Sequence, residues 1–339
     1  AVLLGLPLTD QVITGTREQV RLHARVDDPA AFFALAARFG TVSRERTGNA
    51  NRPAVAIATD SGADFPAEEM ARLDIHLVPQ RLAVDGRDHV DRLSITPHEL
   101  YESMRTSPIP PRTSQPPPGD FRRLFELLLA QHESVVEVSL ARTLSGTLQA
   151  AESAAARTGP GRVHVFDTGS VSNGQGLLVL WAAEAAQAGL DARSILAGLE
   201  RMRPRTQVHA VVRDIRYAVR GGRVPRAALT LTRLLRLSLT LKIRPNGRLG
   251  LGGALWGRRN LPERFARTVI RGLDPARRYR VIIGHCDCAD DARRVEAVLR
   301  AGGLELDRVW IVETGAAIGA HAGPGSLVIG VQDYEAPSP

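Results

Sequence analysis

The sequence predicts an α/β protein of two domains, a parallel-sheet α/β domain over residues 54–205 and an α+β domain over 206–335. Three observations support this prediction. The length of 339 residues exceeds one ordinary domain. From residue 54 to about 205, continuous apolar runs alternate with helical patterns, as in parallel sheets. Beyond that point strand-like runs outnumber helical ones, which indicates a mostly antiparallel sheet of six strands.

The composition indicates a folded globular chain, with 44% hydrophobic and 24% charged residues. No uninterrupted apolar run reaches the roughly 18 residues of a membrane helix, and the start lacks the basic stretch of a signal peptide. Cys286 and Cys288 lie one residue apart, a spacing that suits neither a disulfide nor a complete metal site. These features predict a cytoplasmic protein. The chain begins with Ala1 instead of Met, which indicates processing or a fragment of a longer protein.

The first fifty residues predict a short separate unit. Polar and apolar residues alternate over 19–26, as in a strand, and 30–39 carries a helical apolar stripe after Pro29. The polar run 44–53 is typical of a linker.

The predicted parallel sheet has four strands and four helices. The strands are expected at 54–58, 75–79, 135–140 and 163–167. The helices are expected at 96–104, 119–131, 146–157 and 174–188.

The second domain is expected to have six strands and two helices. The strands are expected at 207–212, 240–243, 249–256, 279–284, 309–312 and 327–331, and the helices at 262–271 and 290–301.

Polar loops follow the predicted parallel strands at their carboxyl ends, where ligands bind in such sheets. Asp60 and Ser61 follow the first strand. The stretch 112–119, read as a rigid loop, carries Thr113 and Ser114, and 143–147 carries Ser145 at the start of a helix. Hydroxyls and free N–H groups at a helix start favour an anion. The alternative is that these hydroxyls only cap helices.

Ser145 also raises the alternative of a small-molecule hydrolase with a serine nucleophile. The candidates for its base and orienting residue are His285, His321, Asp60 and Asp167. The glycine expected two residues before a nucleophilic serine is missing, and no histidine is tied to Ser145 by local spacing.

Two further site types have little support. Cys286, Cys288 and His285 lack the rest of a metal-ligand set, and adjacent side chains of a strand point to opposite faces. The segment 220–223 contains a double glycine but not the spacing of a phosphate-binding loop. We therefore expect neither a metal nor a nucleotide cofactor.

Positive charge is concentrated in one part of the chain. Residues 201–280 contain 21 basic and three acidic residues, in a chain of net charge +8. Such asymmetry is typical of proteins with an anionic partner. Nucleic acid is not expected, because few aromatic residues are interleaved with the arginines. An arginine-rich surface in contact with solvent alone is the alternative.

Five short motifs, taken together, resemble the DegV family, the fatty-acid-binding subunits of bacterial fatty acid kinase. They occur in the order and spacing of that family and are Thr59-Asp60-Ser61, Thr113-Ser114-Gln115-Pro116, Leu144-Ser145-Gly146-Thr147, Gly221-Gly222-Arg223 and His321 with Gly323-Pro324-Gly325. The resemblance covers about 54–333.

The resemblance implies a DegV-like two-domain fold with a long-chain fatty acid buried between the domains. Its carboxylate would be bound by Thr113, Ser114, Ser145 and Gly146, with His321 nearby. It further implies that the chain has no catalytic residue, cofactor or metal of its own and presents its ligand to an ATP-dependent kinase domain.

The resemblance also assigns a role to the basic segment. Arg220, Arg223 and Arg226 would belong to the surface that meets the kinase domain, with transient contact to anionic membrane as a second use. Residues 1–52 resemble the end of the kinase subunit, which implies a natural kinase–DegV fusion in which this segment is a kinase remnant plus linker.

Overall fold

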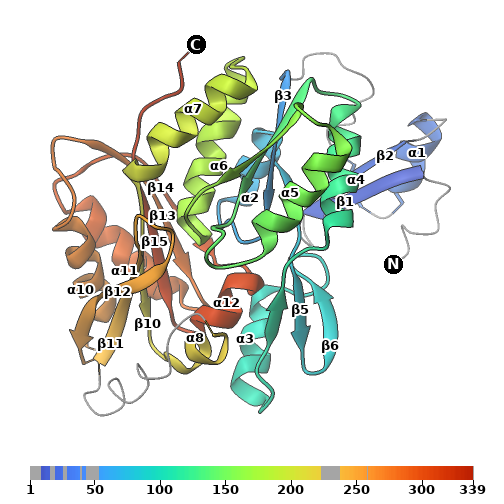
Figure 1. Cartoon of the computed structure of the whole chain (residues 1–339). Helices are drawn as coiled ribbons and strands as arrows, with labels where there is room; N and C mark the ends of the chain where they lie inside the picture. The colour runs from blue at the N-terminus through green and yellow to red at the C-terminus, as the bar shows by residue number, and fades with distance from the viewer. Residues whose placement is uncertain are drawn as a thin grey trace.

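We analysed a computed structural model of the chain (Figure 1), which describes residues 9–15, 20–25, 29–38, 40–42, 53–222, 237–257 and 259–338. Two sheets lie side by side with helices between and around them, and a small hairpin projects at the N-terminal end. The described residues include no helix long and apolar enough to cross a bilayer.

The first large sheet is parallel, as predicted, with the strand order β4-β3-β8-β9. Its strands are β3 (Val55–Asp60), β4 (His76–Val78), β8 (Ser134–Ser139) and β9 (Val163–Asp167). Helices α4 (Pro118–Leu129) and α5 (Thr147–Thr158) cover one face. Helices α2 (Ala67–Arg72), α6 (Ser172–Gln187) and α7 (Ala192–Met202) pack on the other. Every residue of β3 is buried, which explains its continuous apolar run.

The second large sheet has six strands, as predicted, and their order is β12-β11-β10-β15-β13-β14. Its strands are β10 (Thr206–Val212), β11 (Leu237–Ile243), β12 (Leu249–Trp256), β13 (Arg278–His285), β14 (Glu305–Glu313) and β15 (Leu327–Asp333). All neighbouring pairs are antiparallel except β13 and β14. Helices α10 (Leu261–Ile270) and α11 (Ala289–Arg300) cover one face.

A third, three-stranded sheet was not predicted. It has the order β6-β5-β7, with β5 (Arg81–Val84), β6 (Arg87–Val90) and β7 (Arg112–Ser114). Asp85 and Gly86, both with positive φ, form the turn between β5 and β6, as Asp-Gly pairs do in hairpins. The prediction of a loop over 112–119 was wrong for Arg112–Ser114, which pair with β5. Three residues are too few for the sequence to show strand alternation.

Helix α6 lies between the two large sheets, and fourteen of its sixteen residues are buried. It packs on β3 and β8 from one side and on β15, β13 and β10 from the other (Figure 1). Asn173 donates from Nδ2 to the carbonyls of Ile282 at 3.0 Å and Val328 at 2.8 Å. At Gly176 a Cβ would lie 2.1 Å from the Asp64 carbonyl oxygen, so only glycine permits this close approach. The helix therefore joins both domains.

The N-terminal unit consists of two antiparallel strands, β1 (Thr9–Gly15) and β2 (Val20–Arg25), and helix α1 (Pro29–Ala36). The predicted strand 19–26 and helix 30–39 correspond to β2 and α1, whereas β1 was not predicted. Strand β1 lies beside β4 and α4 of the parallel-sheet domain. Most of the predicted linker 44–53 lies outside the described residues.

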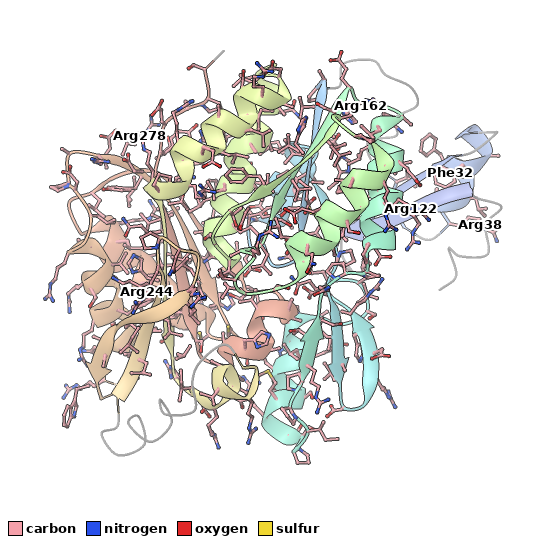
Figure 2. All side chains as sticks on the ribbon, viewed as in Figure 1. Phe32, Arg38, Arg122, Arg162, Arg244 and Arg278 are labelled. Atoms are coloured by element: carbon pink, nitrogen blue, oxygen red, sulfur yellow. The ribbon has the colours of Figure 1, made fainter. Side chains whose placement is uncertain are left out.

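Arginine side chains are distributed over the whole surface. Figure 2 labels exposed arginines in the N-terminal unit, the parallel-sheet domain and the antiparallel domain, which are Arg38, Arg122, Arg162, Arg244 and Arg278. Within the basic segment, several arginines pair with acids from other parts of the chain. Arg205 and Arg277 both pair with Asp333, and Arg280 bridges Glu184 and Asp307. Part of the charge excess is thus neutralised by the fold.

Candidate functional site

A cavity of about 380 Å³ lies between the two domains, and residues of both form its walls. This volume lies within the usual range of small-molecule sites. Its walls include helix α12 (Ala316–Ala322) and helix α8 (Arg216–Arg220). The apolar lining residues are Leu140, Leu144, Val171, Val208, Ala210, Val212, Ala218, Leu241, Leu249, Ala317, Ile318, Ala322 and Val328. The polar ones are Gln80, Thr113, Ser114, Gln115, Ser145, Ser172, Lys242 and His321, with Gly146 contributing backbone.

Most of the wall is aliphatic, and six of its thirteen apolar residues come from strands of the antiparallel sheet. Val208 and Val212 lie on β10, Leu241 on β11 and Val328 on β15, while Leu140 follows β8 of the parallel sheet. A surface of this kind excludes water and favours a hydrocarbon over a polar ligand.

The polar residues include the hydroxyl loops that the sequence singled out. Thr113 lies in β7, and its Oγ1 is 2.8 Å from Nε2 of His321, with which it shares a hydrogen bond. The structure thus joins a side chain of the first domain to a histidine 208 positions later. Ser114 is exposed, whereas Thr113 and His321 are half-buried. Thr113 and His321 are therefore better protected from competing water than Ser114.

His321 is held from a second side by Gly221, which directly follows α8. A Cβ at Gly221 would lie 2.1 Å from Nδ1 of the imidazole, so the backbone of this residue packs on the ring itself. The double glycine of the sequence is therefore required where the basic segment meets the polar part of the cavity.

Ser145 stands immediately before α5, where backbone N–H groups lack helical partners. Its Oγ accepts from the Thr147 N–H at 3.3 Å and shares a 2.8 Å hydrogen bond with the Thr147 hydroxyl. Gly146 lies beneath Gln115, since a Cβ there would be 2.0 Å from Oε1 of that side chain. The N-cap residue of α5 is Gly146, which has no side-chain cap, so Ser145 makes a local hydrogen bond just before the helix and the anion site stays a prediction.

The groups around Ser145 do not form a nucleophile–base pair in the described part of the chain. Both hydrogen bonds of the Ser145 hydroxyl go to Thr147, and Nε2 of His321 bonds to Thr113. Asp167 accepts from the Gly169 N–H at 2.9 Å. His285 does not line the cavity.

Asp60 and Ser61 lie one layer behind the cavity and do not line it. Asp60 is fully buried and accepts from the N–H groups of Gly62 at 2.8 Å and Leu140 at 2.9 Å, and from the amides of Gln175 and Gln80. Burial raises the pKa of this carboxyl, while the four hydrogen bonds act in the opposite direction. Ser61 accepts from the Gln80 N–H at 2.9 Å. Both residues position Gln80, which does line the cavity.

A second buried acid fixes helix α12, which carries His321. Asp64 accepts from the Gly315 N–H at 2.9 Å, the Ser172 hydroxyl at 2.7 Å and Arg92 at 3.0 Å. Nearby Asp91 is also fully buried, and this burial raises its pKa to about 6. Asp64 therefore holds the start of α12 against the first domain.

The sequence analysis missed four polar lining residues, which are Gln80, Gln115, Ser172 and Lys242. Gln115 belongs to a quoted motif, and Lys242 is the only lysine of the chain, which was a usable signal. Arg220, a predicted docking residue, is exposed at the end of α8. Arg223 and Arg226 lie outside the described residues.

Comparison with known proteins agrees with this architecture. Residues 54–333 match the model of the family described as "Uncharacterised protein, DegV family". A DegV domain-containing protein of Deinococcus radiodurans is 31% identical over 283 residues, which span 83% of this chain and 99% of the relative.

Solved structures of DegV family proteins have a fold similar to that of this chain. The structure titled "Fatty Acid Binding of a DegV family Protein from Thermus thermophilus" superposes with a TM-score of 0.76 at 31% identity, covering 84% of this chain and all of that one. A Thermotoga maritima protein, whose title states that it reveals fatty acid binding function, superposes with a TM-score of 0.74 at 26% identity, with 84% and 100% covered. Since the family model spans both domains that enclose the cavity, the chain belongs to the DegV family.

Proposed function

We propose that this protein binds one long-chain fatty acid in the cavity between its domains, with the carboxylate at Thr113, Ser145 and His321. The observation that carries the proposal is the cavity itself, an aliphatic wall with the Thr113–His321 pair among its few polar groups. The fatty-acid binding stated for the Thermus and Thermotoga relatives supports the same ligand.

The physical chemistry of the cavity fits this ligand. Each methylene moved from water into an apolar wall stabilises the complex by about 0.8 kcal/mol. A carboxylate loses its hydration in the same step, so it needs donors already in place. The Thr113 and Ser145 hydroxyls and the N–H groups at the start of α5 would supply these donors, and the His321 ring would orient the Thr113 hydroxyl. Ser114, exposed on the neighbouring loop, is a further donor at the solvent side.

We infer that the bound carboxylate is presented to an ATP-dependent kinase domain, supplied in trans or fused N-terminally, which converts it to an acyl phosphate. The family resemblance of the motifs suggests this role. It is supported by the position of Arg220, exposed one residue from the glycine that packs on His321. A kinase carrying ATP is anionic, and positive charge favours its approach. We place this exchange in the cytoplasm, with no cofactor held by this chain.

The first experiment is mass spectrometry of the lipid extracted from purified protein. We expect about one fatty acid per chain, recovered again when delipidated protein is mixed with free fatty acid. Extracts without fatty acid, combined with no uptake of added lipid, would contradict the proposal.

A second experiment separates carrier from hydrolase. Ser145→Ala should weaken fatty-acid binding by about 1.5–3 kcal/mol, because a hydrogen bond to a charged group is lost. Intact lipid binding with loss of an esterase activity would favour the hydrolase instead.

Charge reversal at Arg220 tests the docking role. The Arg220→Glu variant should form less acyl phosphate with a kinase domain supplied in trans, at unchanged fatty-acid affinity in solution. If acyl-phosphate formation is unchanged and only the transfer of fatty acid from anionic vesicles becomes slower, Arg220 contacts the membrane instead of the kinase domain.

A further inference from the structure

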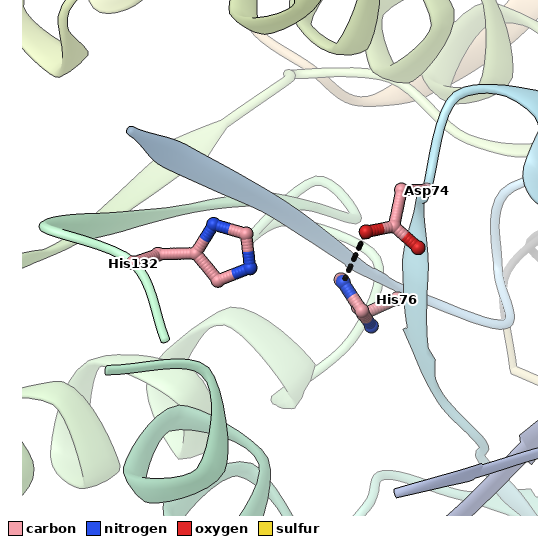
Figure 3. Close-up of side chains that lie close together, drawn as sticks. All are labelled: Asp74, His76 and His132. Carbon is pink, nitrogen blue, oxygen red and sulfur yellow. Dashed lines mark ion pairs between the residues drawn. The ribbon is translucent and has the colours of Figure 1, made fainter. Parts of the chain in front are cut away.

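Two histidines and an aspartate lie together at a position that the proposed function does not use. They are Asp74 and His76 at the start of β4 and His132 just before β8. One ligand atom of each lies within 4.8 Å of the others, and no other such group of three His, Cys, Asp or Glu side chains occurs in the part of the chain that the structure describes. Figure 3 shows His76 between the ring of His132 and the carboxylate of Asp74.

The location is the amino edge of the parallel sheet. His76 opens β4, and His132 comes two residues before the first residue of β8. The polar loops that reach the cavity lie at the opposite, carboxyl edge, where Leu140 and Ser145 follow β8. The cluster is therefore separate from the ligand cavity.

The hydrogen bond of His132 to Pro53 indicates which nitrogen carries the proton. Its Nδ1 lies 2.8 Å from the carbonyl oxygen of Pro53, which can only accept, so Nδ1 carries the proton. The neutral ring then has its lone pair on Nε2, on the side of His76 in Figure 3. A ligand histidine whose other nitrogen donates to a backbone carbonyl is the usual arrangement in metal sites.

The remaining geometry also suits a small divalent cation. His76 is 1% and His132 is 7% exposed, and Asp74 leaves about a quarter of its side chain open to solvent, which provides an entry path. The His76 Nε2 to Asp74 Oδ2 distance is 3.9 Å. Tetrahedral zinc with bonds of about 2.1 Å needs ligand atoms roughly 3.4 Å apart, so the three atoms, which lie within 4.8 Å of one another, would move closer together on binding.

We propose that Asp74, His76 and His132 form a site for a transition-metal dication, with zinc as the best fit and solvent as its fourth ligand. Imidazole nitrogen with one carboxylate oxygen is a donor set that zinc accepts. The metal would tie the start of β4 to the turn before β8, across the central strand β3 that separates them in the sheet. Its role would be structural, because it would join chain segments far from the ligand.

The chain offers a matched control for this site. His98 and Asp287 also lie 3.9 Å apart, at the surface, but they are not part of a group of three. If a histidine–aspartate pair alone were sufficient to bind zinc, the His98–Asp287 pair would bind it too. The proposal expects zinc only at the group of three.

The test uses the full chain without a histidine tag, stripped with a chelator and titrated with Zn²⁺ against a chromophoric competitor. We expect about one tight zinc per chain, a tetrahedral Co²⁺ absorption spectrum on substitution, and a higher melting temperature with metal. Asp74→Asn and His76→Asn should each weaken zinc binding by more than the roughly 10–100-fold that loss of an outer-shell partner costs. His98→Gln should leave it unchanged.

Asp74 is partly exposed, so Asp74→Asn decides the matter if His76→Asn fails to fold. The proposal is wrong if the wild-type chain takes up no zinc at micromolar concentrations. It is equally wrong if Asp74→Asn, folded by circular dichroism, binds zinc as tightly as wild type, since the metal would then lie elsewhere.

Discussion

The Thr113→Val variant isolates the contribution of one hydroxyl to ligand binding. Valine has nearly the same shape as threonine, so the apolar wall is retained and only the hydrogen bonds are lost. Thr113 Oγ1 lies 2.8 Å from Nε2 of His321, so a hydroxyl that donates to the bound carboxylate accepts from the imidazole at the same time. The substitution removes a donor from a buried charge and a partner from the ring.

The expected magnitude follows from these two losses. A hydrogen bond to a charged group contributes about 1.5–3 kcal/mol, which corresponds to a rise in Kd of roughly 10–150-fold. The upper half of that range is expected, because His321 also loses the acceptor that orients it.

The assay is displacement of a fluorescent fatty acid, measured for a free fatty acid and for its methyl ester with both proteins. The ester keeps the tail but removes the charge, so the four affinities form a thermodynamic cycle. Thr158→Val is the control, since Thr158 bonds to the Ala154 carbonyl on α5 and does not line the cavity. Equal losses for acid and ester, or no loss for the acid, would refute the assignment of Thr113 to the carboxylate.

Two further predictions concern stability. Gly176→Ala should lower the free energy of unfolding in urea by about 1–3 kcal/mol, because its Cβ would lie 2.1 Å from the Asp64 carbonyl oxygen. Gly119→Ala is the control, because its Cβ would meet only Arg123 at 3.8 Å, and it should change the free energy of unfolding by no more than about 1 kcal/mol. A similar loss for both variants would contradict this reasoning. Asp91 has a pKa of about 6 in the folded protein and 3.8 in the unfolded chain, so the folded state binds its proton more tightly. The free energy of unfolding should therefore fall by about 3 kcal/mol as the pH rises from about 4 through 6. Asp91→Asn should remove this fall between pH 4 and 7.5, and an unchanged pH profile would show that burial does not control this carboxyl.

The parallel sheet could be predicted because its strands are buried on both faces. The run Val55–Asp60 is buried at every residue, so the sequence carries an uninterrupted signal. The same argument applies to Ser145, which follows the parallel strand β8, but not to Thr113, which lies in the antiparallel strand β7. Thr113 and Ser145 do line one cavity.

Other parts of the site could not be predicted from local pattern. Helix α12 has seven residues, AAIGAHA, without a polar face, so periodicity does not show it. The contact between His321 and Thr113 depends on Asp64 holding the start of that helix, an interaction between residues 251 positions apart. Asp60 was expected at the ligand edge because it ends a strand, but its side chain turns inward to bind the loops that line the cavity.

The position of α6 limits how this protein can be divided experimentally. The predicted boundary near residue 205 separates two topologies, but α6, on the N-terminal side of it, supplies core to both sheets. Trp181 on this helix also donates to the carbonyl of Glu335, close to the end of the chain, at 2.8 Å. Expressed alone, either half would leave one face of an apolar interface in water and should aggregate. Cleavage near the boundary should instead yield two fragments that stay associated and melt together. The two domains differ in topology, but they should unfold in a single cooperative transition.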